Sequence, residues 1–229
     1  MIAVATTYFH IFASRFSLTL IDHPAVLCQS ILFLASKSEE EHRRLRDIIT
    51  VVHRMKYPEA ELLHLGAEHS QLREHIVTTE QLLLRILGFN LNVDLPYDYM
   101  YNMLKYLNAS DALARLATAC LNDLYAFSIV LEFPPPCLAA ASIFMAIQLS
   151  RSTLNDDTAQ MQQEELQKYE CHIGGGDSKI DPNSRTLALD CIAALDMDTI
   201  TILEIATRMM NNYELSPVTP FTFEARKST

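Results

Sequence analysis

Two oppositely charged residues stand where the sequence pattern is otherwise apolar, and they are the first candidates for a functional site. Lys37 ends a largely apolar segment, residues 24–37, and its ammonium group has to reach water or a partner carboxylate. Glu80 stands four residues after Ile76 and four before Leu84, so it lies on or beside the apolar stripe of another predicted helix. A carboxylate buried there without a partner would cost on the order of several kcal/mol. Lys37 is the natural partner, because it ends the helix that is expected to pack alongside.

The environment of Glu80 has a second interpretation, which the sequence leaves open. The same periodicity also fits a glutamate that is solvated at the edge of a wide apolar stripe. In that case the carboxylate needs no partner.

Patterns typical of enzymes and metal sites are weak in this chain. It has no CxxC or HExxH motif, and His64, His69 and His75 do not stand at ligand spacings. The segment GGGDSK, residues 174–179, resembles a phosphate loop only faintly, because no strand pattern precedes it and the spacing is wrong. No serine or cysteine has an evident catalytic partner. We therefore expect no catalytic residue, no metal site and no cofactor.

The composition limits the kinds of partner that the chain can bind. It has 229 residues and a formal net charge of −10, which disfavours a nonspecific phosphate-binding surface. The apolar run at residues 139–149 is shorter than the roughly 20 residues that a helix needs to cross a bilayer. We expect a soluble protein with no direct nucleic-acid partner and no membrane partner.

The cysteines indicate a reducing compartment. They are scattered along the chain with no close pairing, and nothing at the start of the sequence resembles a secretory signal. We interpret them as reduced thiols of a cytosolic or nuclear protein. They are Cys28, Cys120, Cys137, Cys171 and Cys191.

Helical periodicity accounts for most of the chain, and it supplies the elements that have to position Lys37 and Glu80. Pro24 suits the first turn of the helix that ends near Lys37, Asp22 is a candidate cap for it, and Gly88 stands where the helix carrying Glu80 should end. The polar segment 151–184 is predicted to be a long surface loop. The predicted helices are residues 2–16, 24–37, 45–52, 70–87, 96–107, 113–124, 137–149, 185–195 and 199–213.

An internal repeat relates the two halves of the chain. A shift of 111 residues places PAVLCQSILFLASK over PPCLAAASIFMAIQ, with Phe33 on Phe144 and Ala35 on Ala146. The helix at 96–107, which leads the second copy, has no counterpart in the first, so we expect the first copy to lack its first helix. The predicted domains are residues 1–92, residues 93–214 with the loop 151–184, and a disordered tail at 215–229.

Several motifs together resemble the cyclin family. They are LASK (residues 34–37), EE (39–40), RDII (46–49) and EQLLLRIL (80–87), with ATTYFHIF (5–12) near the start. Within the family the chain is most similar to the transcription-type cyclins, near the cyclin Q (or M) group with cyclins L and K as near relatives. The resemblance implies an all-α fold of two tandem five-helix cyclin boxes, the first lacking its first helix.

For function, the resemblance implies a non-catalytic subunit that binds and activates a cyclin-dependent kinase as a heterodimer, in transcription-linked or related signalling. The family's lysine and glutamate that contact the kinase carry over onto Lys37 and Glu80. Leu34, Tyr101 and Leu104 are further predicted kinase contacts, all of them apolar. The expected location is the nucleus, with the cytoplasm as a second one.

Two other functions remain open at this point. An inactive, truncated cyclin would act as a decoy that occupies the kinase without activating it. The box is also shared with adaptors of the transcription-factor IIB type, which bind DNA and are basic, whereas this chain is strongly acidic.

Overall fold

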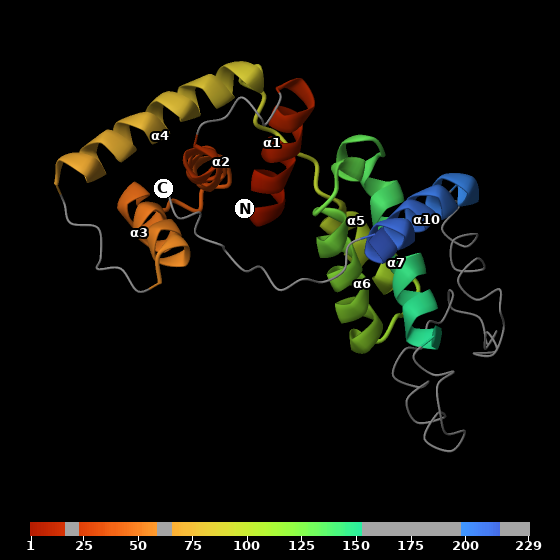
Figure 1. Cartoon of the computed structure of the whole chain (residues 1–229). Helices are drawn as coiled ribbons and strands as arrows, with labels where there is room; N and C mark the ends of the chain where they lie inside the picture. The colour runs from red at the N-terminus through yellow and green to blue at the C-terminus, as the bar shows by residue number, and fades with distance from the viewer. Residues whose placement is uncertain (17–22, 59–65, 153–197, 216–229) are drawn as a thin grey trace. The chain divides into compact units, whose positions relative to one another are not determined.

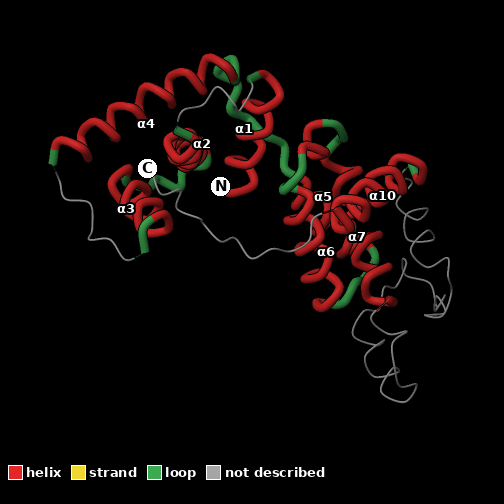
Figure 2. Tube along the Cα trace, in the orientation of Figure 1, coloured by secondary structure: helices red, strands yellow, loops and turns green. Residues whose placement is uncertain are grey.

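The fold class is the predicted one. The computed structural model describes residues 1–16, 23–58, 66–152 and 198–215, and within these ranges all regular structure is helical, with no strand (Figures 1 and 2). The elements are α1 (Ile2–Arg15), α2 (Pro24–Ser38), α3 (Leu45–Lys56), α4 (Ala67–Ile86), α5 (Pro96–Tyr106), α6 (Asp111–Leu124), the short 3-10 helix η2 (Ser128–Leu131), α7 (Pro135–Ser152) and α10 (Thr199–Leu215).

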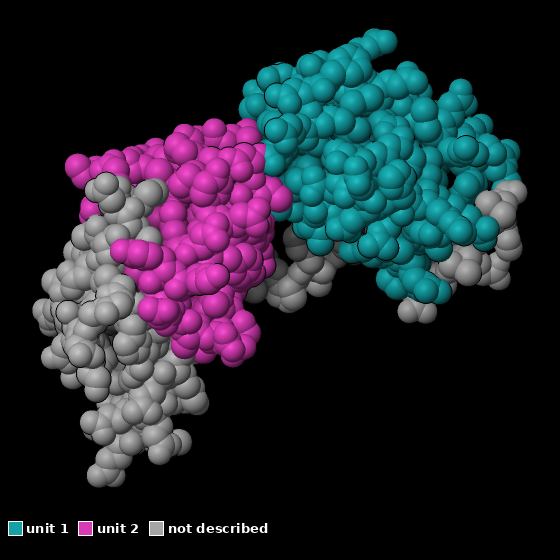
Figure 3. Space-filling view, turned by 180° about the vertical axis from the view of Figure 1, so that it is seen from behind, with its two compact units in different colours: residues 1–93, 218–229 teal, residues 94–217 magenta. Residues whose placement is uncertain are grey.

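The chain divides into two compact units (Figure 3). The first contains Met1–Val93, and its described helices are α1 to α4. The second contains Asp94–Pro217, and its described helices are α5, α6, α7 and α10. That each unit is a cyclin box stays a prediction.

In the first unit, α2 is the central helix. It packs against α1, α3 and α4, which lie around it in Figure 1. A helix that is apolar over most of its circumference is stable in water only when neighbours cover it on several sides. A hydrogen bond also connects α2 to α4. Ser30 on α2 is fully buried, and its Oγ donates to the carbonyl of Ile76 on α4 at 3.1 Å.

The ends of these helices follow from local sequence. Pro24 lies in the first turn of α2, as predicted, whereas the predicted cap Asp22 lies outside the described residues and the N-cap position belongs to His23. After α4 the chain turns at Gly88 with φ 64°, a conformation that costs glycine little. The amide of Gly88 donates to the carbonyl of Arg85 and that of Phe89 to Leu84, which closes the helix with a Schellman motif.

The start of α4 differs from the prediction. The helix begins at Ala67, with Gly66 as its N-cap, and not at residue 70. Its first turn carries no large apolar residue and is exposed except for the half-buried His69, and the apolar stripe begins only at Leu72. Periodicity therefore detects the helix one turn late.

In the second unit, α7 holds the central place and packs against α5, α6 and α10. It begins at Pro135, inside the proline triplet that was predicted to precede it, because proline is tolerated in a first helical turn. It also continues to Ser152, so the first two residues of the predicted loop 151–184 belong to the helix. The rest of that loop, the predicted helix 185–195 and almost all of the predicted tail lie outside the described residues.

The two segments aligned by the 111-residue shift are thus the central helices of their units, α2 and α7. Among the described residues, no helix is both long enough and apolar enough to cross a membrane.

Candidate functional site

The structure brings Lys37 and Glu80 together in the first unit. Lys37 lies in the last turn of α2, and its Nζ is 2.7 Å from Oε1 and 3.0 Å from Oε2 of Glu80 on α4. The side chain of Glu80 is 8% exposed and that of Lys37 is 46% exposed. Of the two interpretations of Glu80, the buried carboxylate with a cationic partner is therefore the one that the structure shows.

The burial of Glu80 follows from its place on α4. It lies on the same buried face of α4 as Ile76 and Leu83, and α4 packs against α2. The ammonium of Lys37 also lies 4.0 Å from the centre of the Phe33 ring, one turn earlier on α2. A cation over an aromatic face is attracted to it, and this contact holds the lysine near the glutamate.

Glu80 does not use every hydrogen-bond donor of the Lys37 ammonium. A lysine ammonium has three N–H donors, and two of them can serve the two oxygens of Glu80. One donor is left, and because the Lys37 side chain is 46% exposed, another molecule can approach the ammonium. The arrangement is thus a fixed, half-exposed cation at the surface, which suits recognition of a polar or anionic group.

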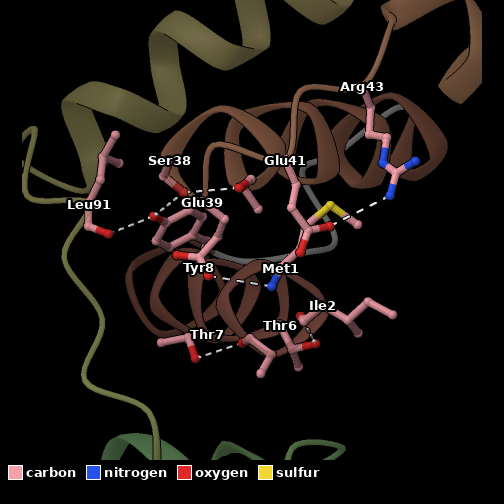
Figure 4. A network of polar contacts seen from close by, with 12 residues as sticks. Met1, Ile2, Thr6, Thr7, Tyr8, Ser38, Glu39, Glu41, Arg43 and Leu91 are labelled. Atoms are coloured by element: carbon pink, nitrogen blue, oxygen red, sulfur yellow. Dashed lines mark hydrogen bonds and ion pairs between the residues drawn. The ribbon is translucent and has the colours of Figure 1, made fainter.

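Tyr8 forms hydrogen bonds near the end of α2, next to the Lys37–Glu80 pair. Its side chain is fully buried, and its hydroxyl donates to the carbonyl of Leu91 at 2.7 Å and lies 3.1 Å from the hydroxyl of Ser38 (Figure 4). Burial raises the pKa of the Tyr8 phenol, so the hydroxyl keeps its proton at neutral pH. Tyr8 thus joins α1 to the residue after Lys37 and to the segment that follows α4.

In the sequence, Tyr8 stands only inside the predicted helix 2–16 and the motif ATTYFHIF, with no role of its own. Its spacing is that of any core aromatic residue, and nothing in the motif shows that a carbonyl more than 80 residues away accepts its proton. A buried tyrosine usually has such a partner, but the sequence does not identify it.

Replacing Tyr8 with phenylalanine should lower the free energy of unfolding by about 1–2 kcal/mol, because the Leu91 carbonyl loses its donor in a part-buried place. Urea denaturation followed by circular dichroism measures the change. The matched control is Tyr99→Phe, since the Tyr99 hydroxyl contacts Asp94 on the exposed surface and its loss should cost less than about 0.5 kcal/mol. Equal losses in the two variants would contradict this role of Tyr8.

The other three predicted contact residues lie in different settings. Leu34, on α2, is 3% exposed, and Leu104, on α5 in the second unit, is 4% exposed. Both are core residues of the described chain. Tyr101 is 49% exposed and lines an open cavity of about 420 Å³ on α6, with its hydroxyl 3.4 Å from Oγ1 of Thr118.

Metal-ligand clusters and cysteines were the remaining candidates for chemistry in the described ranges. No group of three or more histidine, cysteine or acidic side chains is placed there to hold a metal ion. Cys28, Cys120 and Cys137 are free thiols, and burial raises the pKa of Cys120 to about 11, so this thiol is protonated at neutral pH. Cys171 and Cys191 lie outside the described residues.

Comparison with known proteins adds the family context, although no family model matches the chain. It is 28% identical over 201 residues to "Cyclin pch1" of Schizosaccharomyces pombe, covering 82% of this chain and 58% of that protein. It is 33% identical over 163 residues to "Cyclin-T1-4" of Arabidopsis thaliana, covering 68% of this chain and 30% of that protein. With "Cyclin-T1" of Homo sapiens it shares 30% identity over 151 residues, 65% of this chain and 21% of that protein.

The chain therefore corresponds to less than two thirds of the length of each of these relatives. All of them are named as cyclins, and their similarity covers 65% to 82% of this chain. Together with the all-helical fold, they support placing the chain in the cyclin family, among cyclins of the transcription type.

Proposed function

We propose that this chain is a regulatory subunit that binds a cyclin-dependent kinase and activates it, in transcription-linked or related signalling. The observation that carries the proposal is the Lys37–Glu80 pair, a half-exposed ammonium fixed by a buried carboxylate. The cyclin relatives support it. The activity then belongs to the kinase and not to this chain, and the expected location is the nucleus, with the cytoplasm second.

The proposed mechanism is a shift between two conformations of the kinase. The spare donor of Lys37 and the carboxylate edge of Glu80 meet polar groups at the kinase's regulatory helix. Exclusion of water from this contact strengthens each polar interaction. If the chain binds the active arrangement more tightly than the inactive one, the kinase population shifts toward the arrangement that aligns its catalytic Lys–Glu pair and activation loop.

The other three predicted contact residues have different roles in the proposed kinase interface. Tyr101 is exposed and can touch the kinase directly, whereas Leu34 and Leu104 lie in the cores and support the surfaces above them. We further propose that residues 1–92 and 93–214 are the two cyclin boxes. The 111-residue shift aligns Lys37 with Gln148, an exposed and uncharged residue of α7. Only the first box would therefore carry the ionic contact.

The subgroup within the family is a finer proposal. The motif residues around LASK favour the cyclin Q (or M) group, near cyclins L and K. The relatives reported above bear the names pch1 and T, so the subgroup rests on the motif alone.

The test is affinity purification of the tagged chain from cells, identification of the bound kinase, and a kinase assay with and without the purified chain. We expect one cyclin-dependent kinase in stoichiometric amount and a large increase of its activity when the chain is added. A kinase that binds without activation would indicate a decoy. An electrophoretic shift of promoter DNA, with no kinase recovered, would indicate an adaptor.

A further inference from the structure

The helix α3 exposes two large apolar side chains, Val51 and Met55, beside the face that it buries. It packs against α2, and Ile49 is its one buried residue among the described side chains. Val51 is 57% exposed and Met55 is 61% exposed. The main apolar stripe of α3, Leu45, Ile48, Ile49 and Val52, is buried or half-buried. Val51 and Met55 extend the apolar surface beyond that stripe, and this exposed extension is where a partner could pack.

The exposed residues Arg44, Val51 and Met55 and the half-buried Ile48 form one line along the helix. Arg44, Ile48, Val51 and Met55 follow each other at intervals of four, three and four residues, which places them on the same side. Arg54 lies beside Val51 and Met55 in the sequence and is also exposed. We call Arg44, Ile48, Val51, Arg54 and Met55 the α3 surface.

Cations outnumber acids around this line, in a chain whose net charge is −10: the exposed Asp47 is the one acidic residue of α3, against the three cations described next. Arg44 stands at the start of α3, Arg54 and Lys56 in its last turn, and all three are exposed. Within the described part of the chain, none of the three has a carboxylate at ion-pair distance, whereas neighbouring Arg43 lies 3.6 Å from Glu41. The cations are therefore available to an anionic partner.

We propose that the α3 surface docks an acidic segment of a partner protein that carries apolar side chains. The apolar line between cations fits a segment whose own apolar side chains are flanked by aspartate or glutamate. Burial of apolar area supplies the affinity, and the opposite charges orient the segment and speed its association. The proposal does not depend on kinase binding, because Lys37 and Glu80 lie on α2 and α4.

Two other occupants fit the same surface less well. A nucleic acid would meet the cations, but Ile48, Val51 and Met55 are aliphatic or thioether side chains, which offer bases no aromatic face to stack on. A second copy of the chain would bring arginines against arginines, and like charges across an interface oppose association.

The test uses a fluorescein-labelled synthetic peptide of about 18 residues, or five helical turns, built from glutamate and leucine in an amphipathic helical pattern. Binding to the full chain is followed by fluorescence anisotropy. We expect saturable binding that weakens as the salt concentration rises, because salt screens the attraction between the peptide's glutamates and the cations of the α3 surface. Control peptides with glutamine for glutamate, or serine for leucine, should not bind measurably.

Two double variants of the chain locate the site. Val51→Ser with Met55→Ser, and separately Arg44→Glu with Arg54→Glu, should each weaken peptide binding about tenfold or more. The matched controls are Ile200→Ser and Arg115→Glu, exposed residues of the second unit, which should bind the peptide as the parent chain does. All substituted positions are exposed, so helical content should stay unchanged.

The proposal is overturned if the α3 variants bind the acidic peptide as well as the parent chain, or if the glutamine peptide binds equally. It is also overturned if a single-stranded RNA binds the α3 surface in preference to the peptide. Self-association of the parent chain in light scattering that the α3 variants abolish would instead assign the surface to a second copy. Lys37→Glu should leave peptide binding intact.

Discussion

Replacing Lys37 with glutamate is expected to abolish recovery of a cyclin-dependent kinase with this chain. The change removes the ammonium that lies 2.7 Å from Oε1 of Glu80 and sets a second carboxylate beside the first. Like charges repel at that distance, so the two side chains separate and the polar surface proposed to meet the kinase is lost. We expect binding to fall by at least about 2 kcal/mol, or roughly 30-fold, in quantitative co-purification.

The substitution is also expected to destabilise the fold. A second variant separates this loss of stability from the loss of kinase binding. Glu80 is only 8% exposed, so loss of its counter-charge should lower stability by about 1–3 kcal/mol, less than for a fully buried pair because Lys37 is half-exposed. Glu80→Gln keeps the size of the side chain and removes the charge without creating repulsion. It should weaken kinase recovery about tenfold while the chain stays folded.

The matched control for charge reversal is Lys105→Glu, an exposed lysine on α5. This variant should recover the kinase as the parent chain does, and all three variants should show the same helical content by circular dichroism. If the Lys37→Glu chain brings down undiminished kinase, the ion pair is not the contact and the proposed function loses its principal support.

The ion pair could be predicted because both of its members conflict with their surroundings in the sequence. A lysine after an apolar helix and a glutamate on an apolar stripe each need a partner, and helical spacing brings both to the contact between α2 and α4. The same logic predicted α2 and α7, whose apolar residues are too numerous for one face, and their central places follow from that. Local composition was sufficient for these elements.

The exposure of a side chain and its hydrogen-bond partner depend on which other segment packs against it, so they could not be predicted in this way. Leu34 and Tyr101 were both predicted as contact residues, yet one is 3% exposed and the other 49%, because a motif does not say which side of a helix faces the core. The pattern of α3 predicts its buried apolar stripe but not that Val51 and Met55 stay exposed beside it. The partner of Tyr8 is a backbone carbonyl, which no residue type reveals.

Replacing Ile76 with alanine is expected to give the largest loss of stability among single changes in the first unit. Ile76 is fully buried on α4 against α2, and its carbonyl accepts the bond from Ser30. Loss of its buried carbon atoms leaves a cavity, which typically costs about 2–5 kcal/mol. Because a domain of this size has only about 5–15 kcal/mol in total, the urea midpoint should fall markedly at an unchanged slope.

Leu82→Ala on the same helix is the control, because Leu82 is 46% exposed and its truncation should cost about 1 kcal/mol or less. The comparison also bears on the ion pair, since Glu80 lies one turn after Ile76 on the buried face of α4. A cavity at Ile76 loosens the contact that holds Glu80 against α2, so kinase recovery should fall with stability in this variant and remain unchanged in Leu82→Ala. Equal stability losses in the two variants would mean that α4 is not anchored through Ile76, and the placement of Glu80 would then need another explanation.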